Sequence, residues 1–444
     1  MSLDHHDFDL IIAGGSVVDG TGAAARRADI GVRNGLIAEI GQRLDGERER
    51  IDASGMLVTP GFVDVHTHFD AQVTWDDRVE PAVWHGVTTA VIGNCGVGFA
   101  PAKPESRATL IDMMASVEDI PSESMHAALP WSWESYPEFL DVVDSTPRTI
   151  NIASMITHAT LRTYVMGERR AEKPTVAELQ RMAELVREGM RAGAVGLSMS
   201  RTVLHTTGNG QVLPGTFAEE EELVTLARAV REGCGGKRGI LEVSPASTTF
   251  PEPVSLTDDV DMLINVSQKS GCPVVFSLLQ SNHEPLEYET VLAHVAAANA
   301  TGAKVYAEVA TRPVVIMMSL EGGFHPFSSL PSFAAVRHLP LADRVAALRN
   351  PELRQRIVRD KDPNPAGLHL VFADAEFWSQ VFPLGTPLNY YPQYENSFAA
   401  EAQRKGVTPQ EIAYDALLED DGKALITYAV TNWARRNRTD LHRM

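Results

Sequence analysis

The stretch VTPGFVDVHTH, residues 58–68, decides how this sequence folds. Pro60 and Gly61 mark the entry to an apolar run that continues to Val65, and this pattern predicts a buried strand. Alternate side chains of a strand point to the same side, so His66 and His68 are expected to face one side together. At the carboxyl end of a barrel strand, two such imidazoles form half of a metal site.

Further strand-like runs follow this stretch and alternate with helical segments, which is the pattern of a parallel α/β barrel. The predicted strands are residues 62–66, 88–92, 150–156, 194–198, 239–243, 274–279 and 304–309. Seven strands are one fewer than a closed (β/α)8 barrel needs. We therefore predict an α/β fold, a TIM-like barrel without its last strand.

The first 56 residues differ from the rest, because short β-like pieces alternate there with glycine-rich turn signals. Gly14-Gly15 and Asn34-Gly35 are two such signals, and Asn-Gly between apolar runs is a strong hairpin signal. We expect a small β-domain over residues 1–56 and the barrel over residues 57–444. Late in the chain, residues 409–418 are predicted to be helical, with Thr408 as the N-cap.

Charge and composition exclude some classes of function. The 444 residues carry a formal net charge of -19, which disfavours nucleic-acid binding because phosphate contacts need a basic face. No apolar run approaches the roughly 20 residues that span a bilayer, so no membrane association is expected. The three cysteines do not form a disulfide framework, and a reducing cytoplasm is the expected location.

A hydrolytic metal site needs several convergent ligands and an open position for water. Cys95 follows the predicted strand 88–92 through a Gly93-Asn94 turn, and its thiolate is a candidate ligand; an inert buried thiol is the alternative. Asp70 and Glu242 are candidates for holding the ligands in place. Glu242 is also a candidate oxygen ligand, although a salt-bridged carboxylate at the barrel mouth is the favoured interpretation.

At these residues the sequence resembles the amidohydrolase superfamily, and most closely its D-aminoacylase branch, the N-acyl-D-amino-acid deacylases. The resemblance rests on DLIIAGGSVVDG (9–20), GFVDVHTHFD (61–70), HGVTTAVIGNC (85–95), HATLR (158–162) and GAVGLS (193–198). It implies that Cys95 is a metal ligand beside His66 and His68. It also implies that residues 1–56 are half of a composite β-sandwich, and that a lid is inserted at about residues 313–400.

The sequence departs from this branch at three places. The predicted fourth strand has no lysine, which fits the cysteine branch and disfavours dihydropyrimidinases and dihydroorotases. The fifth and sixth strands lack the metal-binding histidines of the branch, and the aspartate of the last strand, its general base, is not found. The catalytic base is therefore unknown. We expect the chain to be C-terminally truncated and, by itself, catalytically impaired.

Cationic side chains follow several predicted strands, where they can hold a substrate carboxylate. His158 and Arg162 match a His-x-x-x-Arg motif of the branch, Arg201 and His205 follow the fourth strand, and Arg312 follows the seventh. For each residue alone, a surface ion pair is the alternative. Together they are the candidate substrate-binding group.

The resemblance implies hydrolysis of a linear amide, an N-acyl amino acid, by a metal-bound hydroxide that attacks the amide carbonyl. Zinc, as one or two ions, is the expected cofactor for a histidine and cysteine donor set. The expected partner is thus a small molecule. Two alternatives stay open: an amidohydrolase of cyclic amides, and a truncated barrel without catalytic activity.

Overall fold

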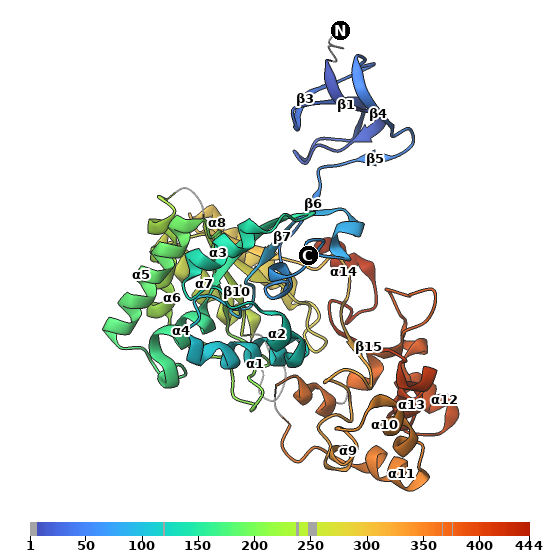
Figure 1. The fold of residues 1–444 in the computed structure, drawn as a ribbon. Helices are drawn as coiled ribbons and strands as arrows, with labels where there is room; N and C mark the ends of the chain where they lie inside the picture. Colours follow the sequence, from blue (N-terminus) through green and yellow to red (C-terminus); the bar gives the residue numbers. More distant parts are fainter. Residues whose placement is uncertain (1–6, 119, 237–238, 247–254, 366, 375) are drawn as a thin grey trace. The chain divides into compact units, whose positions relative to one another are not determined.

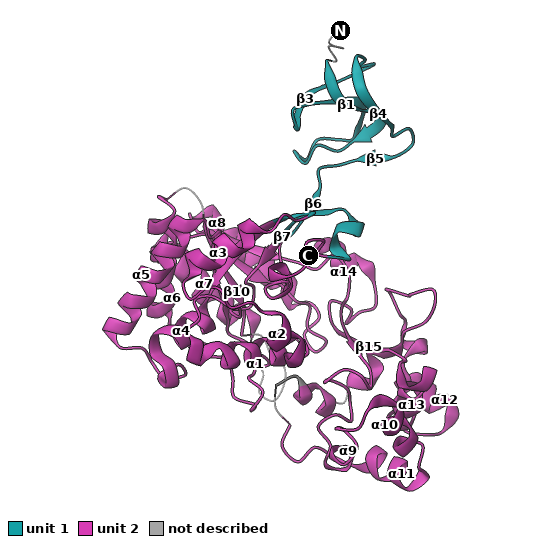
Figure 2. Cartoon of the chain, in the orientation of Figure 1, with its two compact units in different colours: residues 1–64, 80–90, 149–151 teal, residues 65–79, 91–148, 152–444 magenta. Residues whose placement is uncertain are grey.

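The computed structural model describes residues 7–118, 120–236, 239–246, 255–365, 367–374 and 376–444 (Figure 1). The chain divides into two compact units (Figure 2). Unit 1 holds residues 1–64, 80–90 and 149–151, and unit 2 holds residues 65–79, 91–148 and 152–444. The predicted domain limits at residue 56 and the lid at 313–400 stay predictions.

Unit 1 contains a five-stranded mixed sheet. Its strands are β1 (Phe8–Val17), β2 (Arg26–Arg33), β3 (Leu36–Gly41), β4 (Glu47–Asp52) and β5 (Leu57–Val58), in the order β3-β2-β1-β4 with β5 also paired to β1. Asn34 and Gly35 join β2 to β3 with φ angles of 53° and 73°. Two successive positive φ angles are what a two-residue hairpin requires, and the predicted hairpin is confirmed.

Gly14-Gly15 is not the predicted turn. Both residues lie inside the continuous strand β1, where the pairing with β2 shifts between Ile12 and Gly15. Gly14 has a φ of 72°, and its N–H donates to the Asp29 carboxylate at 2.7 Å. A β-bulge uses a glycine with positive φ just as a turn does, so the sequence signal is the same for both.

The main sheet has seven strands in sequence order, and the predicted seven-stranded parallel arrangement is confirmed. Its strands are β6 (Phe62–Asp64), β7 (Val87–Ile92), β8 (Asn151–Thr157), β9 (Gly196–Ser200), β10 (Ile240–Ser244), β11 (Val274–Ser277) and β12 (Val305–Glu308). The intervening helices include α4 (His158–Met166), α5 (Val176–Ala192), α6 (Glu220–Gly233), α7 (Leu256–Ser270) and α8 (Glu287–Ala300). Figure 1 shows these helices grouped around the strands.

The two faces of this sheet differ in polarity. Side chains in register on neighbouring parallel strands share a face, and Leu241, Val274 and Val305 are in register and fully buried. They belong to the core that also takes in residues of α6, α7 and α8. One residue along, Glu242 pairs with Ser198, so these two polar side chains lie on the opposite face.

The first strand is less buried than predicted. Phe62, Val63 and Val65 keep 59%, 56% and 51% of their surface exposed. The cause is position, because β6 is the edge of the seven-stranded sheet and pairs within it only with β7 among the described strands. Apolar composition alone does not distinguish an edge strand from a central one.

The remaining elements lie outside the seven-stranded sheet. Three strands form an antiparallel sheet in the order β13-β15-β14: β13 (Val314–Met318), β14 (Val381–Pro383) and β15 (Ile426–Thr431). The other helices are α1 (Arg107–Glu118), α2 (Ser122–Ala128), α3 (Tyr136–Ser145), α9 (Pro331–Ala334), α10 (Leu341–Leu348), α11 (Pro351–Arg359), α12 (Phe398–Lys405), α13 (Pro409–Leu417) and α14 (Arg438–Arg443). Thr408 caps α13 as predicted. Within the described ranges, no helix has the length and apolarity to cross a bilayer.

Candidate metal centre

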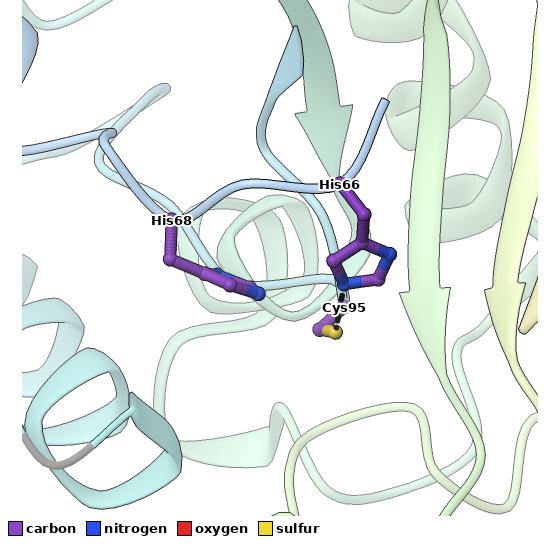
Figure 3. A group of neighbouring side chains, drawn as sticks. All are labelled: His66, His68 and Cys95. Carbon is purple, nitrogen blue, oxygen red and sulfur yellow. Dashed lines mark hydrogen bonds between the residues drawn. The ribbon is translucent and has the colours of Figure 1, made fainter. Parts of the chain in front are cut away.

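His66 and His68 lie in the segment that follows β6, and Cys95 lies in the loop that follows β7 (Figure 3). That loop turns sharply, since Cys95 has a φ of 55° between Gly93 at 79° and Gly96 at 73°. A Cβ atom on Gly93 would lie 2.3 Å from the carbonyl oxygen of Met155. Only glycine fits this approach, so the Gly93-Asn94 signal in the sequence is what brings the sulfur to the histidines.

The three predicted ligands come together. One ligand atom from each of His66, His68 and Cys95 lies within 4.8 Å of the others, and His66 Nε2 is 3.2 Å from Cys95 Sγ. Zinc bonds of about 2.3 Å to sulfur and about 2.0–2.1 Å to nitrogen place tetrahedral ligand atoms about 3.5 Å apart. The donor types and spacing therefore fit a zinc ion. Ser244 donates a hydrogen bond to the sulfur at 3.2 Å.

Two carboxylates adjoin this group. Glu242, on β10, is 1% exposed and accepts the Cys95 backbone N–H at 3.2 Å. Glu308, at the end of β12, lies 2.5 Å from Nδ1 of His66 and accepts from Ser277 at 3.0 Å. Ligand atoms of His66, Glu242 and Glu308 also lie within 4.8 Å of one another.

Two residues here bear on the sequence interpretation. Among the described residues Glu242 forms no ion pair with a lysine or arginine, and its role, a salt-bridged carboxylate or an oxygen ligand, stays a prediction. Glu308 was not singled out from the sequence. The signal was present, because it is a carboxylate near the carboxyl end of the predicted strand 304–309, as His66 is for the first strand.

Burial and close charges shift the pKa values of the group. Burial lowers the pKa of His66, but the adjacent Cys95 sulfur and the carboxylates of Glu308 and Glu242 outweigh it and raise this pKa to about 12. Burial raises the pKa of Cys95 to about 11 and that of Glu242 to about 8. Burial holds the pKa of His68 well below its ordinary value. A divalent cation would replace protons on this buried set.

His68 and Asp70 lie with His66 in the segment that follows β6. Nε2 of His68 is 3.2 Å from the Glu118 carboxylate, while its Nδ1 is buried with no hydrogen-bond partner in the described part of the chain. Asp70 is 3% exposed, and burial raises its pKa to about 8. Its role in holding the ligands stays a prediction.

The five predicted substrate-binding residues have different partners in the structure, and their common role stays a prediction. His205 is 2.9 Å from the Ser200 hydroxyl, and burial together with the charge of His66 lowers its pKa to about 4. Arg201 pairs with Asp259 at 2.8 Å. Arg312 is exposed and stacks over the ring of Tyr390 at 5.5 Å.

His158 and Arg162 belong to a buried ion pair network. They are 1% and 3% exposed, and both contact the Glu222 carboxylate, His158 at 2.8 Å and Arg162 at 3.0 Å. Arg162 also donates to the carbonyl of Glu172. Binding of a substrate carboxylate by these residues stays a prediction, and it would have to compete with Glu222.

Comparisons with known proteins bear on the family of this chain. A family model described as the amidohydrolase family matches residues 49–376. An uncharacterised protein of Mycobacterium tuberculosis is 38% identical over 237 residues, which are 50% of this chain and 38% of that protein. D-aminoacylase of Alcaligenes xylosoxydans xylosoxydans is 38% identical over 199 residues, which are 44% of this chain and 38% of that enzyme.

Among solved structures, N-acyl-D-glutamate deacylase of Bordetella bronchiseptica, crystallised with zinc and a phosphonate inhibitor, shares the fold. The TM-score is 0.59 at 24% identity, over 98% of this chain and 73% of that chain. The chain spans less than half the length of the two curated relatives. The predicted resemblance to D-aminoacylases is confirmed. On the family match over most of its length, this chain belongs to the amidohydrolase family.

Proposed function

We propose that the protein is a metal-dependent hydrolase of linear amides and that its substrates are N-acyl-D-amino acids. The observation that carries this proposal is the convergence of His66, His68 and Cys95 within 4.8 Å in an amidohydrolase fold. The names of relatives, a D-aminoacylase and an N-acyl-D-glutamate deacylase, support the substrate class.

The residues of the chain have distinct roles in this proposal. His66, His68 and Cys95 would hold zinc, which when bound supplies a Lewis acid and lowers the pKa of water. The Ser244 hydroxyl, through its hydrogen bond to the sulfur, stabilises the thiolate form of Cys95. Glu308 binds Nδ1 of His66 and so leaves Nε2, which faces the sulfur, as the metal-binding nitrogen.

Substrate recognition is assigned to the segment after β9. The charge of His66 acts on the pKa of His205, and Arg201 begins the same loop after β9. Both are polar side chains at the carboxyl end of a parallel strand, where barrel enzymes bind their substrates. We propose that His205 contacts the substrate near its scissile amide and that Arg201 binds the substrate carboxylate.

The test is a hydrolysis assay with the zinc-loaded protein on N-acetyl-D-amino acids, their L-enantiomers and a cyclic amide such as hydantoin. We expect release of acetate from the D-enantiomers only, at a reduced rate because the general base of the branch is not found in this sequence, with Cys95→Ala inactive. Hydrolysis of the cyclic amide alone would replace the proposed substrate class. Zinc-loaded, folded protein that hydrolyses none of these compounds would contradict the proposed function.

A further inference from the structure

We infer that Glu242 is a further metal ligand of this centre, so that β10 supplies a carboxylate oxygen where histidines and a cysteine supply the other donors. This inference rests on the metal centre of the proposed function and extends its set of ligands. It concerns the chain's own residues, and it can be tested by metal binding without any measurement of hydrolysis.

The first observation is an unsatisfied oxygen. Glu242 is 1% exposed, and its Oε2 accepts the backbone N–H of Cys95 at 3.2 Å. Its Oε1 is buried with no hydrogen-bond partner anywhere in the described ranges. A buried carboxylate oxygen without a hydrogen-bond donor is destabilising, and a bound cation would supply the missing partner.

The second observation is where this side chain lies. Glu242 is in register with Ser198 on β9, and Ser244, two residues along β10, donates to the Cys95 sulfur. Because side chains alternate along a strand, Glu242 and Ser244 lie on the same face of β10, the face that contacts Cys95. A carboxylate oxygen of Glu242 lies within 4.8 Å of a ring nitrogen of His66.

The third observation is that Glu308 and Glu242 differ in their partners, which indicates a positioning role for Glu308 and a ligand role for Glu242. Glu308 has partners for its oxygen, since Oε1 contacts both Nδ1 of His66 and the Ser277 hydroxyl. Glu242 receives no side-chain donor in the described part of the chain. Glu308 thus satisfies its charge through His66, whereas Glu242 has an oxygen free to coordinate a cation.

The experiment compares zinc affinity, by chelator competition, in the wild-type protein and in Glu242→Gln. Glutamine keeps an oxygen for the Cys95 N–H and removes only the negative charge. We expect zinc affinity to fall by more than the roughly 10–100-fold that loss of an outer supporting group costs. The optical spectrum of the cobalt-substituted protein is expected to change as well.

Two controls exclude general damage. Glu222→Gln removes another buried carboxylate of unit 2, 5% exposed and bonded to His158, and is expected to leave zinc affinity unchanged. Metal-free Glu242→Gln is expected to unfold at about the temperature of the metal-free wild type, because glutamine keeps the oxygen that accepts the Cys95 N–H. If that variant does not fold, Glu242→Ala is measured in the same way.

The outcomes separate the two claims. Wild-type zinc affinity together with an unchanged cobalt spectrum in Glu242→Gln would overturn the inference and leave the proposed function standing. Failure of the wild type to bind zinc would overturn both. Weakened zinc binding in the variant, with no amide hydrolysis by the wild type, would support Glu242 as a ligand and contradict the proposed function.

Discussion

At the scale of single residues, the centre depends on how His66 is held. Its Nδ1 faces Glu308 and its Nε2 faces Cys95, so the two ring nitrogens have different partners. A carboxylate on one nitrogen fixes the tautomer and the ring orientation, and directs the lone pair of the other nitrogen toward the metal. His66 can be recognised in the sequence from the His-x-His motif, but its supporting carboxylate, Glu308, is 242 residues away.

The role of Glu308 gives a prediction. Glu308→Gln is expected to weaken zinc binding by about 10–100-fold while the number of ligands stays the same, because an amide holds the imidazole less strongly than a carboxylate does. Chelator competition measures the affinity, and the cobalt spectrum reports the ligand set. Ser277→Ala, which removes only the hydroxyl that contacts Glu308, serves as the milder comparison. A Glu308→Gln protein with wild-type affinity would show that Glu308 does not position His66.

Residue types showed which side chains could bind metal, but not which of them meet. His66, His68 and Cys95 were predictable because a strand pattern and a glycine turn precede them. Glu308 and the unsatisfied oxygen of Glu242 were not, since their significance depends on contacts with His66 and Cys95, which lie far from them in the sequence. The same limit explains His158 and Arg162, whose buried partner Glu222 is 64 and 60 residues away.

At the scale of secondary-structure elements, the alternation of side chains along the strands is the main feature that made the sheet predictable. Every second residue of β10 and β11 belongs to the apolar core, and the predicted strands fall within two residues of the observed limits. The turn after β7 is the most specific element. It combines two glycines at positive φ with a cysteine also at positive φ.

Gly93 gives a test of that turn. Gly93→Ala places a Cβ 2.3 Å from the Met155 carbonyl oxygen at a φ of 79°, so β7 and β8 must separate locally and Cys95 must move. We expect loss of zinc binding and a destabilisation well above the roughly 1–2 kcal/mol of a left-handed alanine alone. Gly271→Ala is the matched control, with a φ of 69° and nothing within 4 Å of the new Cβ. Equal effects of both substitutions on stability and zinc would contradict the account.

Some element predictions failed for stated physical reasons. Gly14-Gly15 is a bulge within β1, since positive φ serves bulges and turns alike. The strand β6 is exposed because it lies at the edge of its sheet, a property set by its neighbours and not by its own apolar residues. By contrast, α13 begins where Thr408 and Pro409 predict, because capping is local.

At the scale of the whole molecule, the fold class and the family were predictable from periodicity and motifs, and the match over residues 49–376 confirms the family. The substrate was not predictable, because a barrel of this type presents different side chains from its loops on a common frame. The chain spans less than half the length of the curated relatives it matches, and the activity of the whole protein is therefore a proposal.

The central claim is that His66, His68 and Cys95 form a metal centre, and elemental analysis with zinc titration tests it most directly. The protein is loaded with zinc, freed of excess metal and compared with the Cys95→Ala variant. Cys95 is 6% exposed in the wild type, and its replacement by alanine removes the sulfur donor. The account predicts about one zinc ion or more per wild-type chain and a large loss of affinity in the variant. Folded wild-type protein that retains no zinc, or a variant with unchanged zinc content and affinity, would contradict it.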